Sequence, residues 1–169
     1  DIVHGERWGQ DVPRDPTRRH IPIADRMMEL GKLGRKTGAG WYRYPGGGGK
    51  VEDPIVADLA LEEAHFAGIA RVDYAPDEIR ERLLLAMINE AADILDEGIA
   101  QSARDIDLVT VFGYGFPRWH GGLMQYADTI GAQEIVRKLD ELAKDDPVAW
   151  KASSVLRECA KNGTALADY

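Results

Sequence analysis

The stretch VFGYGFPRWHGGLMQYAD, residues 111–128, places Arg118 and His120 among glycines, a proline and several aromatic rings. Three interpretations fit these residue types. A glycine-rich backbone can cradle phosphate with its N–H groups, and a histidine beside a substrate can serve as a general base. Glycine and proline together can also form a stiff corner between helices. We favour the corner, with aromatic side chains such as Phe116 and Trp119 docking against another part of the protein.

The other glycine clusters do not match a nucleotide-binding loop. GAGWYR at 38–43 and GYGFPR at 113–118 contain G-x-G without the third glycine, and neither follows a buried strand. PGGGGK at 45–50 lacks the spacing and the Ser or Thr of a phosphate-binding loop. We interpret these clusters as helix caps and corners, and 45–50 as a linker or loop tip. No cofactor-binding residue is predicted in this chain.

The reactive side chains form no recognisable catalytic or metal-ligating set. His4, His20, His65 and His120 share no helical spacing, and no pattern of cysteines or carboxylates accompanies them. Cys159 lies in a predicted helix and is interpreted as a small core residue. We therefore predict neither a catalytic residue nor a metal site.

Two polar groups are candidates for contact with a ligand or a neighbouring element. Asn89 lies in a strongly apolar helix, so it is expected either to tie that helix to a loop or to contact a ligand. Arg35 and Lys36 follow a helix end, where cations are favourable, and they could also meet the phosphates of an anionic ligand. The candidate substrate or interface residues are Arg35, Lys36, Asn89, Phe116, Trp119 and His120.

The composition limits the class of protein. The chain has 169 residues, of which 44% are hydrophobic, and a net charge of −8. These values are typical of a globular protein and argue against non-specific binding to nucleic acid or anionic membranes. Cys159 is the single cysteine, which excludes an internal disulfide and fits a reducing compartment. No apolar run is long enough to span a bilayer.

The apolar spacing predicts an all-α fold. No convincing period-2 alternation is present, and the longest pattern, 76–98, begins with Pro76 and closes at Gly98. Its apolar residues with a 3.6-residue period are Ile79, Leu83, Ala86, Met87, Ala91, Ile94 and Leu95. Further helices are predicted over 22–34, 53–69, 102–113, 131–143 and 153–163. The helix predicted over 102–113 begins with the capping pair Ser102 and Asp105.

A weak internal repeat is also present. A shift of 129 residues sets MMELGKLG (27–34) on LRECAKNG (156–163) with three identities. We expect residues 1–44 to be the tail of a truncated first helical unit, 45–77 a glycine-rich linker and connecting helix, and 78–169 a near-complete second unit. Because the chain also starts without Met, it is expected to be a piece of a longer protein.

Two segments carry a resemblance to a known family. LGRKTGAGWYRY, together with INEAADILDEGIA and DIDLVTVFGYGFPRWHGGLMQYAD, resembles the C-terminal region of 3-hydroxyacyl-CoA dehydrogenases. The similarity is closest to multifunctional fatty-acid β-oxidation enzymes that fuse an enoyl-CoA hydratase to this dehydrogenase. The resemblance implies a tandem pair of helical domains and oxidation of (3S)-hydroxyacyl-CoA to 3-oxoacyl-CoA with NAD. It also implies that a hydratase domain and an NAD-binding Rossmann domain with a His–Glu pair lie upstream.

One departure from the family indicates a non-catalytic copy. The catalytic helical unit of these enzymes carries Asn-Arg near the start of its long helix, where this sequence has Glu81-Arg82. The resemblance therefore implies a scaffold that lines the acyl-CoA cleft and forms a dimer-like interface with the first unit or a second copy. The alternatives are a stand-alone helical dimerisation module, or a CoA-binding module that uses Arg35 and Lys36. The terminal ALADY lacks a peroxisomal Ser-Lys-Leu tail, which favours a bacterial cytoplasmic location.

Overall fold

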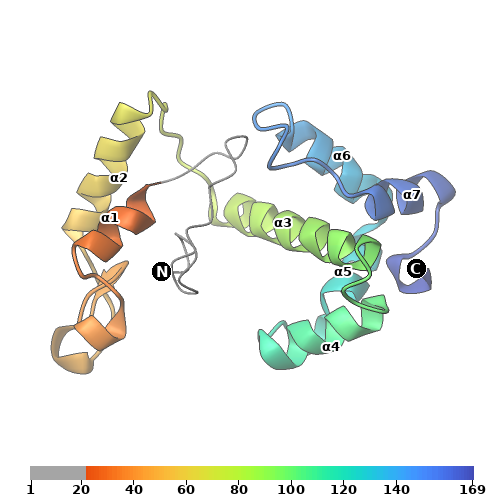
Figure 1. Ribbon diagram of the computed structural model, residues 1–169, viewed down its shortest axis with the longest axis horizontal. Coiled ribbons are helices and arrows are strands. Elements are labelled where there is room, and N and C mark those ends of the chain that lie inside the picture. The colour runs from red at the N-terminus through yellow and green to blue at the C-terminus, as the bar shows by residue number, and fades with distance from the viewer. Residues whose placement is uncertain (1–21) are drawn as a thin grey trace. The chain divides into compact units, whose positions relative to one another are not determined.

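The computed structural model describes residues 22–169, and the chain divides into two compact units between Asp73 and Tyr74 (Figure 1). The first unit is described over residues 22–73, drawn in red to yellow. The second unit comprises residues 74–169, drawn in green to blue. Each unit is held by its own set of contacts and is described separately.

The repeat boundaries expected from the sequence stay a prediction, and the contacts group part of the expected connecting segment with the residues before it. A first repeat was expected over 1–44 and a connecting segment over 45–77, but residues 45–66 fold with the elements that precede them. The expected first repeat is described from residue 22 onward. Residues 1–21, which include two of the four histidines, lie outside the described residues.

The first unit consists of two helices that pack against each other and a short hairpin between them. Its elements are α1 (Ile23–Glu29), η2 (Arg35–Thr37), β1 (Tyr42–Arg43), η3 (Pro45–Gly47), β2 (Val51–Glu52) and α2 (Pro54–Phe66). The strands pair antiparallel, with Tyr42 opposite Glu52. The glycine run of 45–50 is the turn of this hairpin, and Gly46 and Gly47 have φ angles of 59° and 73°, which favour glycine.

Polar contacts hold the first unit together. Asp53 caps α2 by accepting a hydrogen bond from a backbone N–H of its first turn at 3.2 Å. The same carboxylate forms an ion pair with Lys32, whose side chain is only 12% exposed. Arg26 of α1 donates to Glu62 and Glu63 of α2, both at 2.6 Å. These contacts join the two helices on either side of the hairpin.

The second unit is a bundle of helices around α3 (Figure 1). Its elements are α3 (Pro76–Asp96), α4 (Ala103–Gly113), η4 (Arg118–His120), α5 (Leu123–Ile130), α6 (Ala132–Leu142), α7 (Ser154–Asn162) and η5 (Leu166–Asp168). Helices α5 and α7 pack on α3, α6 packs on α7, and α4 packs on α5. The capping pair predicted for α4 is confirmed, because the Ser102 Oγ accepts a hydrogen bond from the backbone N–H of Asp105.

An apolar core fills the space where these helices meet. Its largest fully buried side chains are Ile88, Met124, Ile135, Leu139, Leu156, Leu166, Val155 and Cys159. Burial of apolar area at this scale is the main stabilising term in a domain of this size. The interpretation of Cys159 as a core residue is confirmed.

Helix α3 is apolar on two faces, and only one of them is inside the unit. Leu85 and Ile88 face the core. In contrast, Ile79, Leu83 and Met87, which belong to the pattern that predicted this helix, are 46%, 61% and 41% exposed. The same pattern includes Ala91 and Leu95, which are buried in the core, so it located the helix correctly but did not separate the covered face from the uncovered one.

The all-α fold class is confirmed, because the strands described in residues 22–169 are two residues long and the other elements are helical. The six predicted helices correspond to α1, α2, α3, α4, α6 and α7. Helix α5 was not predicted as a separate element, since it begins inside the glycine-rich stretch.

The repeat stays a prediction, and the helix ends do not coincide at the shift of 129 residues. Helix α1 ends before Gly31 and α7 ends before Gly163, and both glycines have a φ of 69°. The two glycines coincide at a shift three residues longer, and the helix ends at a shift four residues longer.

Candidate functional site

The stretch 111–128 forms a tight corner between α4 and α5. The backbone N–H of Phe116 donates to the carbonyl oxygen of Thr110 at 2.9 Å, and that of Tyr114 donates to the same oxygen at 3.3 Å. Gly115 then adopts a φ of 72° and Gly121 a φ of 80°. The chain therefore reverses by means of left-handed glycines and a capped helix end.

Side chains of α4 cap the beginning of α5. The Asp107 Oδ1 accepts hydrogen bonds from the backbone N–H groups of Met124 at 2.7 Å and Gln125 at 3.4 Å. The Thr110 Oγ1 accepts from the N–H of Leu123 at 3.3 Å. Burial raises the pKa of the Asp107 carboxyl, and the two hydrogen bonds only partly offset this effect. Because these N–H groups are already satisfied, they are not available to cradle a phosphate.

Gly122 permits this close approach of α4 to α5. It has a φ of 130°, and a Cβ atom at this position would overlap the side-chain carbons of Asp107. A side chain here would force the capping carboxylate away from the helix that it caps. Gly122 is visible in the sequence, but no sequence pattern indicates that Asp107, fifteen residues earlier, packs against it.

Part of the aromatic cluster packs together at the corner. The rings of His120 and Tyr126 meet edge to face with their centroids 4.6 Å apart, and Phe116 lies 6.1 Å from Tyr126. Trp119 instead is 83% exposed. The guanidinium of Arg118 lies over the Phe112 ring at 5.4 Å. The structure thus brings Phe116 and His120 together and leaves Trp119 open to a partner.

Asn89 ties α3 to the loop before α7. Its Nδ2 donates to the carbonyl oxygen of Lys151 at 2.9 Å, and its Oδ1 accepts from the N–H of Ser153 at 2.8 Å. Both ends of the Asn89 amide therefore form hydrogen bonds within the unit. This agrees with the expectation that Asn89 ties its helix to a loop. The loop it holds is 151–153 and not the corner at 111–128.

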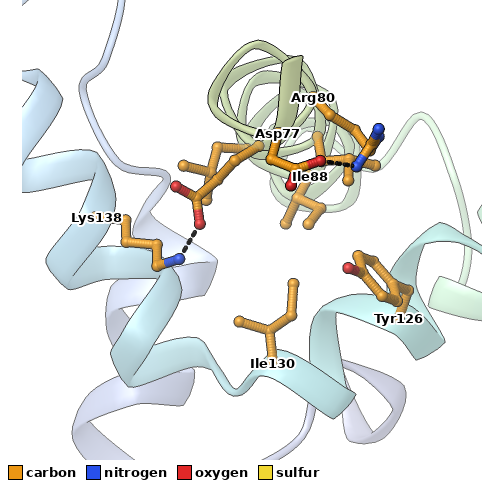
Figure 2. A pocket seen from close by; sticks show the side chains of 9 residues that line it. Asp77, Arg80, Ile88, Tyr126, Ile130 and Lys138 are labelled. Carbon is orange, nitrogen blue, oxygen red and sulfur yellow. Dashed lines mark hydrogen bonds and ion pairs between the residues drawn. The ribbon is translucent and has the colours of Figure 1, made fainter. Parts of the chain in front are cut away.

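A small pocket beside the start of α3 has its charges paired (Figure 2). It has a volume of about 180 Å³, and its charged groups include Asp77, Arg80 and Lys138. Arg80 donates to Asp77 at 2.5 Å, and Lys138 pairs with Glu81. Tyr126 points its hydroxyl into the space. Because the acids and bases satisfy one another, none of these charged groups is poised for proton transfer.

A wider apolar groove lies between α3 and α4, which diverge after the connection that joins them (Figure 1). Its volume is about 870 Å³, and it is lined by Met87 and Ile94 from α3, Ile99 from the connection, Val109 from α4, and Tyr114 directly after α4. Ile99 and Tyr114 are 70% and 78% exposed. An exposed apolar surface of this kind is typical of a protein–protein contact site. We call it the α3–α4 groove.

The sequence-based candidates do not form one site. Arg35 and Lys36 belong to the first unit, and the other four candidates belong to the second. Within the second unit, Asn89 lies on α3, and the other three lie at the corner. Sequence reasoning missed the α3–α4 groove, although the second apolar face of α3 was a signal for it.

The described residues present few of the other features that define a functional class. None of the helices between residues 22 and 169 combines the length and hydropathy that a membrane span requires. The same residues contain no group of three His, Cys, Asp or Glu side chains placed to hold a metal ion.

Comparison with known proteins identifies relatives for nearly the whole chain. Residues 79–166 match the family described as 3-hydroxyacyl-CoA dehydrogenase, C-terminal domain. The chain is 39% identical over 159 residues to the peroxisomal bifunctional enzyme of Homo sapiens, which covers 92% of this chain and 22% of the relative. The corresponding enzyme of Danio rerio is 40% identical over 140 residues, covering 78% of this chain and 20% of the relative.

A plant relative extends the comparison. A peroxisomal fatty acid beta-oxidation multifunctional protein of Arabidopsis thaliana is 31% identical over 151 residues, covering 87% of this chain and 21% of the relative. The chain thus spans about a fifth of the length of the curated relatives it matches. The expected bacterial cytoplasmic location is wrong, because these relatives are peroxisomal proteins of animals and plants.

Proposed function

The chain belongs to the family of 3-hydroxyacyl-CoA dehydrogenase C-terminal domains, and we propose that it is the C-terminal part of an NAD-dependent dehydrogenase of fatty-acid β-oxidation. The whole enzyme would oxidise (3S)-hydroxyacyl-CoA to 3-oxoacyl-CoA and would be fused to an enoyl-CoA hydratase. One observation supports this most strongly: the matched residues 79–166 coincide with the compact unit 74–169. The names of the relatives also support a peroxisomal location.

NAD would bind in an upstream domain and not in this chain. A dinucleotide site of Rossmann type needs a parallel strand, a tight turn and a helix N-terminus in sequence. The described residues form one antiparallel pair of two-residue strands, which does not fit that requirement. The N-terminus of α5 is buried and capped by Asp107 and Thr110. We therefore derive no reaction step from the residues of this chain.

The role of the second unit would be to dock against a preceding helical unit of the same enzyme. The α3–α4 groove is apolar, open and lined from two rigid helices, so it suits a helix with an apolar face. The human relative is about four times as long as this chain, so a longer native protein would supply such a unit. In this arrangement the scaffold closes one side of the acyl-CoA cleft, while the catalytic groups lie upstream.

The activity is tested by expressing the full-length protein beside residues 1–169. We expect the full-length protein to reduce NAD when given 3-hydroxybutyryl-CoA, measured as NADH absorbance. Residues 1–169 alone should produce no NADH, because no catalytic residue is assigned to them. Turnover by residues 1–169 alone, or a folded full-length protein without activity on hydroxyacyl-CoA thioesters, would contradict the proposal.

The docking role is tested by matched surface substitutions. Val109 lines the groove and Val148 lies outside it, and they are 56% and 45% exposed. Val109→Asp should lower the melting temperature of the full-length protein, because docking would bury the new carboxylate. Val109→Asp should leave the melting temperature of residues 1–169 unchanged. Val148→Asp should change the melting temperature of neither the full-length protein nor residues 1–169. Equal effects of the two variants would remove this assignment.

The rival occupant of the groove is a second copy of the chain, as expected for a stand-alone dimerisation module. Sedimentation of residues 1–169 distinguishes docking within one longer protein from dimerisation of the chain. A monomer at micromolar concentration supports docking within one protein, and a dimer that Val109→Asp dissociates supports the rival.

A further inference from the structure

A short segment of the first unit concentrates positive charge in an otherwise acidic protein. Residues 30–51, here called the basic hairpin, contain five Lys and Arg side chains and no Asp or Glu, in a chain with a net charge of −8. The segment includes β1, the turns on either side of it and the first residue of β2, and it is bordered by Glu29 on one side and by Glu52 and Asp53 on the other. Such a local reversal of charge attracts anionic groups that the remaining surface repels.

Hydrogen bonds and close packing hold the backbone of the basic hairpin between Leu33 and Tyr44. The N–H of Gly34 donates to the carbonyl oxygen of Ala39, and that of Tyr44 donates to the carbonyl oxygen of Gly38, both at 2.8 Å. The Thr37 hydroxyl lies between them and accepts from the N–H of Leu33 at 3.0 Å. A Cβ atom on Gly40 would collide with the backbone of Gly34. The positions of the charged side chains are therefore set by a closely packed loop and not by an open chain.

Three of the five cations of the basic hairpin form no ion pair. Lys32 is paired with Asp53, and the charge of Arg43 acts on the same carboxylate and lowers its pKa, whereas Arg35, Lys36 and Lys50 have no ion-pair partner within residues 22–169. Two of these three lie over tyrosine rings: Arg35 over Tyr44 and Lys50 over Tyr42, each at 4.7 Å from the centroid. A cation–π contact fixes a side chain without cancelling its charge, so both groups can still meet an anion.

An exposed indole lies beside these cations. Trp41 is 56% exposed and lies in the bend that directly precedes β1. Arg43 follows two residues later and donates to the backbone carbonyl oxygen of Glu52 at 3.5 Å, and the exposed Lys36 lies in the 3₁₀ turn just before the bend. An aromatic ring with flanking cations matches a planar base that carries several phosphates.

We propose that the basic hairpin binds the phosphorylated adenine nucleotide of coenzyme A. This inference rests on the proposed function, which makes an acyl-CoA the substrate of the whole enzyme. The adenine ring stacks on Trp41, and Lys36 and Arg43 neutralise the 3′-phosphate and the diphosphate. The thioester end extends away from the hairpin, so no reacting atom contacts this segment.

The test is calorimetric titration of residues 1–169 with CoA, dephospho-CoA and inorganic phosphate at low salt. We expect CoA to bind, and dephospho-CoA to bind about tenfold more weakly, because it lacks the phosphate that adds two charges. Inorganic phosphate should bind more weakly than either, since it cannot stack. Equal affinity for CoA and dephospho-CoA, or stronger binding of phosphate, would overturn the assignment.

Matched variants locate the site. Lys36→Glu should weaken CoA binding about tenfold or more, whereas Lys161→Glu, which makes the same charge change at an exposed position of α7, should leave it unchanged. Trp41→Leu should weaken binding and abolish any quenching of tryptophan fluorescence by CoA. Equal CoA affinity in the two Lys variants removes the site.

These titrations measure CoA binding and not turnover, so their result is independent of the NADH assay that tests the proposed function. CoA binding that fails while the full-length protein oxidises hydroxyacyl-CoA removes only the basic hairpin site. Binding that succeeds while the full-length protein is inactive removes only the dehydrogenase.

Discussion

The two units of this chain are stabilised in different ways. In the second unit, buried side chains from α3, α5, α6 and α7 form one contiguous apolar core. In residues 22–73, the buried apolar side chains are Met27 and Leu59, and buried polar groups such as Asp53 lie beside them. The first unit relies instead on ion pairs, helix caps and the hydrogen bonds of its hairpin.

This difference indicates which unit can stand alone. A contiguous apolar core gives a cooperative domain, whereas a few polar contacts offset little of the entropy lost on folding. The second unit should therefore fold independently and keep its outer apolar groove for a partner. The first unit should depend more on pH and salt, because ion pairs contribute a larger share of its stability.

Truncation of the cores should have the largest effect and should separate the units. Ile88→Ala is expected to cost the second unit about 3 kcal/mol, since Ile88 is fully buried and leaves a cavity. Leu59→Ala in the first unit should cost less, about 2 kcal/mol, because fewer buried side chains surround it. Urea titrations followed by NMR measure both, with the indole signals of Trp150 and Trp41 reporting the second and first units. A shift of both signals in either variant would contradict independent units.

The corner of the second unit should be the next most sensitive point. Gly122→Ala should cost about 2 kcal/mol or more, because the new methyl group displaces Asp107 and the backbone has a positive φ. Gly115→Ala is the matched control: its φ is also positive, but no atom lies within 4 Å of its Cβ position, so about 1 kcal/mol is expected. The Trp150 midpoint in urea gives both values. Equal costs would mean that the fit of Gly122 against Asp107 is unimportant.

Local signals predicted the helices but not the contacts between them. The capping pair at Ser102, Pro76 in a first turn and the apolar periodicity identified α3 and α4, because these signals act within a few residues. Helix α5 was missed because its cap comes from Asp107 and Thr110 on another helix. The α3–α4 groove was missed because periodicity alone does not reveal which of two apolar faces the unit covers.

The ion pair of the first unit offers a third comparison. Lys32→Met leaves the buried carboxylate of Asp53 without its cation and should cost the first unit about 1 to 3 kcal/mol. Lys36→Met is the control, since Lys36 is exposed and has no ion-pair partner among the described residues. The Trp41 midpoint in urea should fall in the first variant only, and the Trp150 midpoint should stay constant in both. An unchanged Trp41 midpoint in Lys32→Met would show that polar contacts do not stabilise this unit.

The smallest effect, about 1 kcal/mol or less, is expected from two aspartates whose pKa values move in opposite directions. The hydrogen bond from Lys32 lowers the pKa of Asp53, so its contribution is present above the unfolded pKa and is lost as the pH falls through the folded pKa. Burial raises the pKa of Asp107, so its contribution is present below the unfolded pKa and is lost as the pH rises through the folded pKa.

Substitution by asparagine isolates these two titrations from those of the other carboxylates. Between pH 7 and pH 3, the cost of Asp53→Asn, taken from the Trp41 midpoint, should shrink. Over the same range the cost of Asp107→Asn, taken from the Trp150 midpoint, should grow, because only the parent protein gains from protonating that carboxyl. If both costs changed in the same direction with pH, the electrostatic contrast between the two helix caps, and with it the contrast between a polar and an apolar unit, would not hold.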